Sequence, residues 1–223
     1  KRALLAGWLF GVAHFTVTDN WIATAFTYQA EMPAILGWAA VPLLALYLAV
    51  WPAFATCAAW LIARRANLFA FALAFGAMWI AAEWLRSWVF SGYSWGPFSM
   101  MMLGPWDRPG SAALLPYAGS YALSGITVAL AVALVWFAQA KRFVGIGLVC
   151  FVVAMVYFPA GKGRDGSLPL TLVQPNLRQD EIDDASKFEE QFQRIAGLSR
   201  AEGPQSRRLV LWPESGIPDY LRD

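Results

Sequence analysis

The chain has 223 residues, of which 58% are hydrophobic and 14% are charged. Soluble globular domains carry charge on about a quarter of their residues, so this composition excludes an ordinary soluble protein and indicates membrane segments. The formal net charge is +2, and the basic residues of the apolar part stand in dispersed pairs. Nucleic acid is therefore not an expected partner, because its binding needs a basic surface.

Three basic pairs, Lys1-Arg2, Arg64-Arg65 and Lys141-Arg142, separate long apolar runs at every second gap. Cytoplasmic loops of membrane proteins are enriched in lysine and arginine, so the pairs predict three points on the cytoplasmic side. The turns at 19–31 and 91–116, and everything after the last apolar run, then face outward. We therefore expect a multi-pass protein of a bacterial inner membrane whose C-terminal part lies in the periplasm.

The apolar runs predict a transmembrane bundle over residues 1–160, because about 20 apolar helical residues cross a hydrocarbon core of about 30 Å. The predicted spans are residues 3–26, 33–63, 68–90, 117–139 and 143–158. Pro42 and Pro52 predict a kink in the second span. The first residue is a lysine and the last follows shortly after a strand-like run, so we expect a chain that is incomplete at both ends.

After a polar, glycine-rich linker at 161–167 the character of the chain changes. Residues 161–223 hold nine basic and eleven acidic side chains, against eight and four in residues 1–160. Buried strands are predicted at 168–173 and 208–212, with an amphipathic helix at 185–200 between them. This order forms one βαβ unit, which is normally parallel and right-handed. One unit cannot cover both faces of its strands, so residues 168–223 are predicted to begin a larger α/β domain.

Glu214 is the sharpest candidate for chemistry, because it directly follows the second predicted strand. Ligand sites of open α/β sheets form at the carboxyl ends of their strands. Pro213 and Pro218 stiffen this loop, which suits a carboxylate that must be held in place for proton transfer. The alternative is a loop glutamate that caps the next helix.

Two segments, LVQPNL at 172–177 and LWPESGIPD at 211–219, resemble the opening strands of the nitrilase, or carbon–nitrogen hydrolase, superfamily. With a membrane bundle before them, they resemble the apolipoprotein N-acyltransferase family. EWLRSW at 83–88, GYSW at 92–95 and the Asp-Asn-Trp at 19–21 are similar to membrane segments of that family. The resemblance implies a multi-pass helical bundle followed by the first βαβ part of a nitrilase-like αββα sandwich.

The resemblance also implies an enzyme that moves an acyl chain from a phospholipid to the N-terminal amine of a lipoprotein, without a cofactor. The family uses a Glu–Lys–Cys triad in which a cysteine thioester carries the acyl chain, and Glu214 matches the general base. The lysine and cysteine are expected beyond Asp223, so this stretch alone is expected to be inactive. Cys57 and Cys150 lie in predicted spans, where a cysteine acts as a small hydrophobe, and no metal site is expected.

Charged and aromatic residues near the outer interface form a second candidate site. Glu83 and Arg86 lie three residues apart on one helix face. Two interpretations stay open for them: a packing ion pair, or contact with substrate, including a lipid phosphate. Trp88, Tyr93 and Trp95 either line a path for lipid entry or form an aromatic belt.

Two rival functions follow from the same residues. A membrane-tethered nitrilase-type amidase would use water in place of the amine acceptor, but it would not need five spans to hold one soluble domain. A transporter or channel with a small periplasmic cap would need charges facing a central cavity in several spans. The sequence offers only Glu83, Arg86 and His14 for that purpose. A hydrogen bond between helices is the alternative role for His14.

Overall fold

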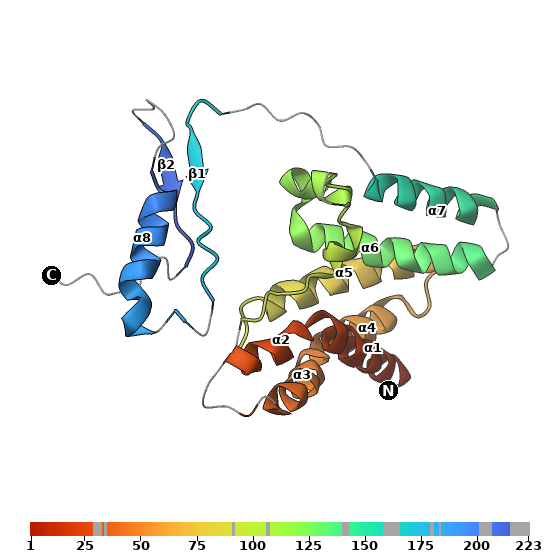
Figure 1. The fold of residues 1–223 in the computed structure, drawn as a ribbon. Coiled ribbons are helices and arrows are strands. Elements are labelled where there is room, and N and C mark those ends of the chain that lie inside the picture. Colours follow the sequence, from red (N-terminus) through yellow and green to blue (C-terminus); the bar gives the residue numbers. More distant parts are fainter. Residues whose placement is uncertain are drawn as a thin grey trace. The chain divides into compact units, whose positions relative to one another are not determined.

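The computed structural model describes residues 1–28, 33, 35–90, 92–105, 108–139, 143–157, 166–178, 181–182, 184–200 and 207–214. They form two compact units. Helices α1 to α7 make up a helical unit, and β1, α8 and β2 make up a small α/β unit (Figure 1).

The first predicted span is divided in the structure. Helix α1 covers Arg2–Thr18, and a short helix α2 covers Trp21–Ala25, followed by the 3-10 turn η1 at Phe26–Tyr28. Asp19 ends α1: its backbone N–H donates to the carbonyl of Phe15 and its side chain is buried. The structure thus differs from one continuous helix over 3–26, because the chain turns at Asp19 and Asn20.

The second predicted span consists of helices α3, Ile35–Leu48, and α4, Val50–Ala63, joined at Ala49. Pro52 has no N–H to donate to the carbonyl four residues earlier, which favours a break at this point. Pro42 lies inside α3. The two helices together form a continuous apolar stretch of 29 residues.

The remaining long helices are α5, Leu68–Arg86, and α6, Leu115–Gln139, which pack against each other. Gly76 permits this packing, since a Cβ there would lie 2.7 Å from the carbonyl oxygen of Gly125. Among the described residues, three helical stretches are long and apolar enough to cross a membrane: Ile35–Ala63, Leu68–Arg86 and Ser111–Phe137. The first and fifth predicted spans form the shorter helices α1, of 17 residues, and α7, Phe143–Val156, of 14.

The helices form a continuous row of contacts, α1 on α3 and α4, α4 on α5, and α5 on α6. Small side chains fill the helix contacts, including the fully buried Ala45, Ala55 and Ala59. The chain between α5 and α6, residues 87–114, is called the outer loop after its predicted orientation, and it contains the 3-10 turns η2, Phe98–Met102, and η3, Ser111–Leu114. An antiparallel bridge from Leu103 to Gly110 closes this loop on itself.

The second unit is a parallel pair of strands, β1 at Leu170–Leu172 and β2 at Leu209–Leu211, in register from Leu170 with Leu209 to Leu172 with Leu211. The connection contains the turn η4, Ala185–Lys187, and helix α8, Phe188–Leu198. Arg208 ties these elements together: its guanidinium donates to Thr171 Oγ1 at 2.9 Å and to the carbonyl oxygen of Ser199. Parallel strands place both carboxyl ends at one edge of the sheet.

Candidate functional site

Glu83 anchors the outer loop to helix α5. Its side chain is only 6% exposed, and its Oε1 accepts two hydrogen bonds. One comes from Trp79 Nε1 at 3.0 Å, one turn earlier on α5, and the other from the backbone N–H of Phe98 at 2.7 Å. Glu83 Oε2 is buried without a hydrogen-bond partner in the described part of the chain. The carboxylate therefore holds η2 onto the bundle through Oε1, while Oε2 could still accept a hydrogen bond.

Arg86 repeats this arrangement one turn later. The side chain is 3% exposed, and Nη1 donates to the carbonyl oxygen of Trp95 at 2.7 Å. The guanidinium lies 5.1 Å above the ring of Phe15 on α1 and 5.8 Å from the ring of Tyr93. Such cation–π contacts are strengthened where water is excluded. Arg86 thus joins α1, α5 and the outer loop.

Polar groups of α1 and the outer loop surround this pair of charges. Thr18 Oγ1 donates to Asp19 Oδ1 at 3.4 Å. Asp19 Oδ2 and the Tyr93 hydroxyl are buried, and these two side chains interact with each other. Burial, and then the neighbouring Asp19 carboxylate, raise the pKa of the Tyr93 phenol, so this group stays protonated. The imidazole of His14 packs against Phe15 and Phe98.

The space beside Glu83 and Arg86 is small. A cavity lined by these two residues, His14, Phe15 and Gly96, among others, has a volume of about 10 Å³. This is about the room that one water molecule needs. Contact of Arg86 with a lipid phosphate, or of Glu83 with a substrate, stays a prediction, and in this structure both groups are enclosed. Their hydrogen bonds show that they position the loop backbone.

Two tryptophans next to this site, Trp88 and Trp95, have exposed side chains. Trp88 is 56% exposed and packs edge-on against Trp84, with ring centroids 5.1 Å apart. Trp95 is 57% exposed and lies 4.9 Å from the ring of Trp21 on α2. Met100 and Met101 of η2 are also exposed. The backbone of the loop is fixed from inside by Glu83 and Arg86, while its apolar side chains remain available on the outside.

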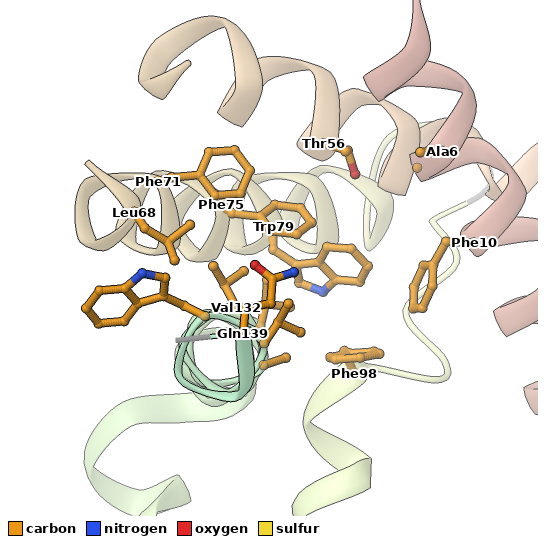
Figure 2. Close-up of a pocket in the computed structure, with 15 residues that line it drawn as sticks. Ala6, Phe10, Thr56, Leu68, Phe71, Phe75, Trp79, Phe98, Val132 and Gln139 are labelled. Atoms are coloured by element: carbon orange, nitrogen blue, oxygen red, sulfur yellow. The ribbon is translucent and has the colours of Figure 1, made fainter. Parts of the chain in front are cut away.

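A separate apolar groove lies among α1, α4, α5, α6 and η2 (Figure 2). Its volume is about 470 Å³. Phe71, Phe75 and Trp79 line it from α5, and Val132 and Trp136 line it from α6. The arrangement offers an apolar ligand a binding site inside the helical unit.

Glu214 lies in the second unit, three residues after β2, and its side chain is exposed. The parallel register places the residues after β1 and those after β2 at the same edge of the sheet. Trp212 Nε1 donates to Ser199 Oγ at 2.8 Å, which fixes the start of this loop against the end of α8. Pro218 and the other residues at 215–223 lie outside the described residues. Cys57 in α4 and Cys150 in α7 are free thiols of the helical unit.

The sequence pattern pointed to Glu83, Arg86 and Tyr93 but not to their partners. Trp79 could have been found, because residues four apart share a helix face. The N–H of Phe98 and the carbonyl of Trp95 carry no side-chain signature, so the sequence alone gives no sign of them. The hydrogen bond from the N–H of Ser99 to Ser124 Oγ, at 2.9 Å, was missed for the same reason.

A family model and individual relatives of this chain point to the same family. A family model described as the apolipoprotein N-acyltransferase N-terminal domain matches residues 1–133. An apolipoprotein N-acyltransferase of Brucella melitensis is 33% identical over 240 residues, which cover 99% of this chain and 44% of that protein. The one from Methylococcus capsulatus is 27% identical over 236 residues, covering 100% of this chain and 44% of that protein.

A similar protein of the same description from Rhodopseudomonas palustris is 29% identical over 246 residues, covering 98% of this chain and 43% of its own length. The chain thus spans less than half the length of these relatives. The matched family model covers most of the helical unit, and the relatives extend the similarity through the α/β unit. The chain belongs to the apolipoprotein N-acyltransferase family.

Proposed function

We propose that the whole protein transfers an acyl chain from a phospholipid to the N-terminal amine of a lipoprotein, with Glu214 as the general base. Family membership along nearly the full chain carries this proposal. The position of Glu214 supports it, since the residue follows β2 at the edge where parallel α/β sheets form their sites. The helical unit is proposed to lie in the bacterial inner membrane, with the α/β unit on the periplasmic side.

The proposed chemistry has two steps. Glu214 takes the proton of a cysteine thiol, and the thiolate sulfur attacks the ester carbonyl carbon of the phospholipid. The C–O bond breaks, the lysophospholipid alcohol leaves with the proton that Glu214 returns, and a thioester remains. The lipoprotein amine then attacks the thioester, the C–S bond breaks, and Glu214 takes the amine proton and passes it to the departing thiolate. A lysine stabilises the oxyanion of both tetrahedral intermediates.

The lysine and cysteine of this triad are not assigned within the 223 residues. The relatives are more than twice as long as this chain, so they have room for both groups in the remaining sequence. Cys57 and Cys150 belong to helices of the other unit and are not proposed as the nucleophile. The activity is therefore proposed for the whole protein.

The exposed face of the small sheet supports assigning the second unit to a nitrilase-like αββα sandwich. Thr171 and Val210 point to the more protected face, whereas four leucines occupy the other face and are at least 44% exposed. They are Leu170, Leu172, Leu209 and Leu211. Parallel sheets are covered on both faces, and a second sheet in a sandwich would cover these leucines.

The outer loop is proposed to guide lipid to the active site. Trp88 and Trp95 are exposed at the end of the bundle that we propose to lie on the periplasmic side, and amphipathic rings favour the membrane–water interface. Glu83, Arg86 and Tyr93 are proposed to hold the loop in the shape that lipid meets. This division assigns contact to the exposed tryptophans and positioning to the enclosed polar groups.

The decisive experiment replaces Glu214 by glutamine in the full-length protein. Glutamine keeps the size and hydrogen-bonding capacity but cannot accept the proton, so thioester formation from phospholipid should fall about 10²- to 10⁴-fold. The protein should remain folded in the membrane. Glu189, an exposed carboxylate of α8, gives the matched control, and Glu189→Gln should leave the rate unchanged.

Acylation of the Glu214→Gln enzyme at the wild-type rate would contradict the role of Glu214. Release of free fatty acid without any transfer to amine would instead favour the amidase-like use of water. Thioester formation is measured by mass spectrometry of the intact protein, and folding by its thermal unfolding in detergent.

A further inference from the structure

Three aromatic rings lie close together in the lining of the apolar groove of the helical unit. Phe10, Trp79 and Phe98 come from α1, α5 and η2, and their ring centroids lie 5.1 to 5.9 Å apart. Figure 2 shows Leu68 at the opposite end of the lining from Phe10 and Phe98. A full transmembrane helix cannot run past these rings, whereas a flexible chain that enters from the Leu68 end can stop at them.

Two polar groups of the lining, on Thr56 and Trp79, already have hydrogen-bond partners within the protein. Thr56 Oγ1 donates to the carbonyl oxygen of Pro52 at 2.8 Å, and Trp79 Nε1 donates to Glu83. Gln139 is the last residue of α6, at the same end of the groove as the start of α5. A polar ligand would lose its own hydration beside this mostly apolar lining, so the groove favours an apolar ligand.

The length of the groove corresponds to one leaflet. Leu68 and Trp79 are eleven residues apart on α5, which is about 16 Å along a helix with a rise of about 1.5 Å per residue. The hydrocarbon core of a bilayer is about 30 Å thick, so the groove reaches about half of its depth. An acyl chain held there belongs to the leaflet on the Leu68 side.

Positive charge next to Leu68 favours an anionic headgroup. Arg64 and Arg65 form the turn between α4 and α5, three to four residues before Leu68, and both are exposed. Basic residues beside a gap between membrane helices attract anionic headgroups. We infer that the groove binds one acyl chain of an anionic phospholipid from the leaflet next to Arg64 and Arg65, whose phosphate these arginines hold.

This lipid is distinct from the proposed acyl donor, because Arg64, Arg65 and Leu68 lie at the end of α5 opposite the outer loop. It is bound for its tail and headgroup and is not consumed. Binding at this site does not depend on the acyl-transfer activity, and the two ideas can fail separately.

The test uses the full-length protein in phosphatidylcholine vesicles that contain traces of photoreactive phosphatidylglycerol. A diazirine at the end of the acyl chain should label Phe10, Trp79 and Phe98, and a diazirine near the glycerol should label the surroundings of Leu68. Peptides are identified by mass spectrometry after irradiation. The same diazirine on phosphatidylcholine should label the three rings several-fold less.

Two variants locate the site. Val132→Trp fills the groove from α6 and should reduce labelling of the three rings several-fold, while Ile126→Trp, at an exposed position of the same helix outside the groove, should not. Replacing Arg64 and Arg65 together by glutamine should remove the preference for phosphatidylglycerol. Labelling spread evenly over lipid-facing positions of the unsubstituted protein, or equal labelling by both lipids, would overturn the inference.

Discussion

The two units of the chain bury different kinds of side chain. In the helical unit, many buried side chains are small or polar, beside a few large ones such as Phe15 and Leu48, and many large apolar side chains are exposed, among them Leu5, Trp38 and Phe69. In the α/β unit, α8 buries Ile195 and Gln191, whose amide donates to the carbonyl oxygen of Glu181, and exposes Glu189 and Glu190. Helices in lipid gain little by hiding apolar surface from each other, so small residues and hydrogen bonds decide how they pack.

The polar interior of the helical unit is therefore its most sensitive part. Glu83 Oε1 satisfies both Trp79 Nε1 and the N–H of Phe98, and the buried Arg86 lies one turn away. Glu83→Ala would leave two donors and one cation without this carboxylate, and breaking a buried charge arrangement in this way costs about 3–5 kcal/mol. We expect that loss in the thermal unfolding of the full-length protein in detergent.

Glu83→Gln separates geometry from charge. The glutamine carbonyl can accept both hydrogen bonds, so this variant should lose less stability than the alanine variant. Trp84→Leu, at an exposed neighbouring position, is the control and should unfold close to wild type. If Glu83→Ala unfolds at the wild-type temperature, the outer loop is held by other contacts. The polar interior is then not the most sensitive part of the helical unit.

Close packing of helix α1 against Ala49 is a second sensitive feature of the helical unit. A Cβ on Gly11 would lie 2.8 Å from Ala49 Cα and 3.0 Å from Ala49 Cβ. Gly11→Ala must push α1 away from the junction of α3 and α4, and overpacking of this kind costs about 1–3 kcal/mol. Detergent unfolding of the full-length protein should show the loss.

Gly147 supplies the matched control, because a Cβ there meets nothing within 4 Å. Alanine is favoured over glycine inside a helix by about 0.8–1.0 kcal/mol, so Gly147→Ala should leave stability unchanged or raise it slightly. Equal effects of the two substitutions would show that helix propensity, rather than the approach of α1 to Ala49, decides the stability of the bundle.

The sequence predicted the general architecture because it depends on composition and periodicity. Runs of apolar residues placed helices in the described part of the bundle, and the observed strands β1 and β2 fall within the predicted runs at 168–173 and 208–212. The break at Asp19 was missed, since a buried carboxylate at a helix end looks like a polar interface residue in the sequence. The environment of Glu83 and Arg86 was also missed, because backbone groups supply most of their partners.

The smallest expected change in stability concerns two helix caps, one in each unit. Asn67 caps α5 with a hydrogen bond from the N–H of Ala70 to Oδ1 at 2.9 Å, and Asp184 caps η4 with a hydrogen bond from the N–H of Ser186 to Oδ1 at 2.9 Å. The hydroxyl of Ser186, and then its N–H, lower the pKa of the Asp184 carboxyl below the ordinary 3.8. The Asn67 amide does not titrate.

The two caps should therefore respond differently to acid. A carboxyl whose pKa is lowered in the folded state contributes its stabilisation above the ordinary value of 3.8, and this contribution is lost as the pH falls through the lower folded value. The stabilisation from the Asn67 cap should be constant over the same range, and Asn67→Ala should cost about 1 kcal/mol both at neutral pH and in acid.

Hydrogen exchange measures each cap locally. Peptides that contain Ala70 or Ser186 are followed at neutral pH and in acid, and the rates are corrected for intrinsic exchange. Loss of protection at Ser186 in wild type but not in Asp184→Asn would support the titration, because the amide keeps the acceptor and cannot be protonated in this range. Equal loss in both proteins would assign the acid sensitivity to another group of the α/β unit.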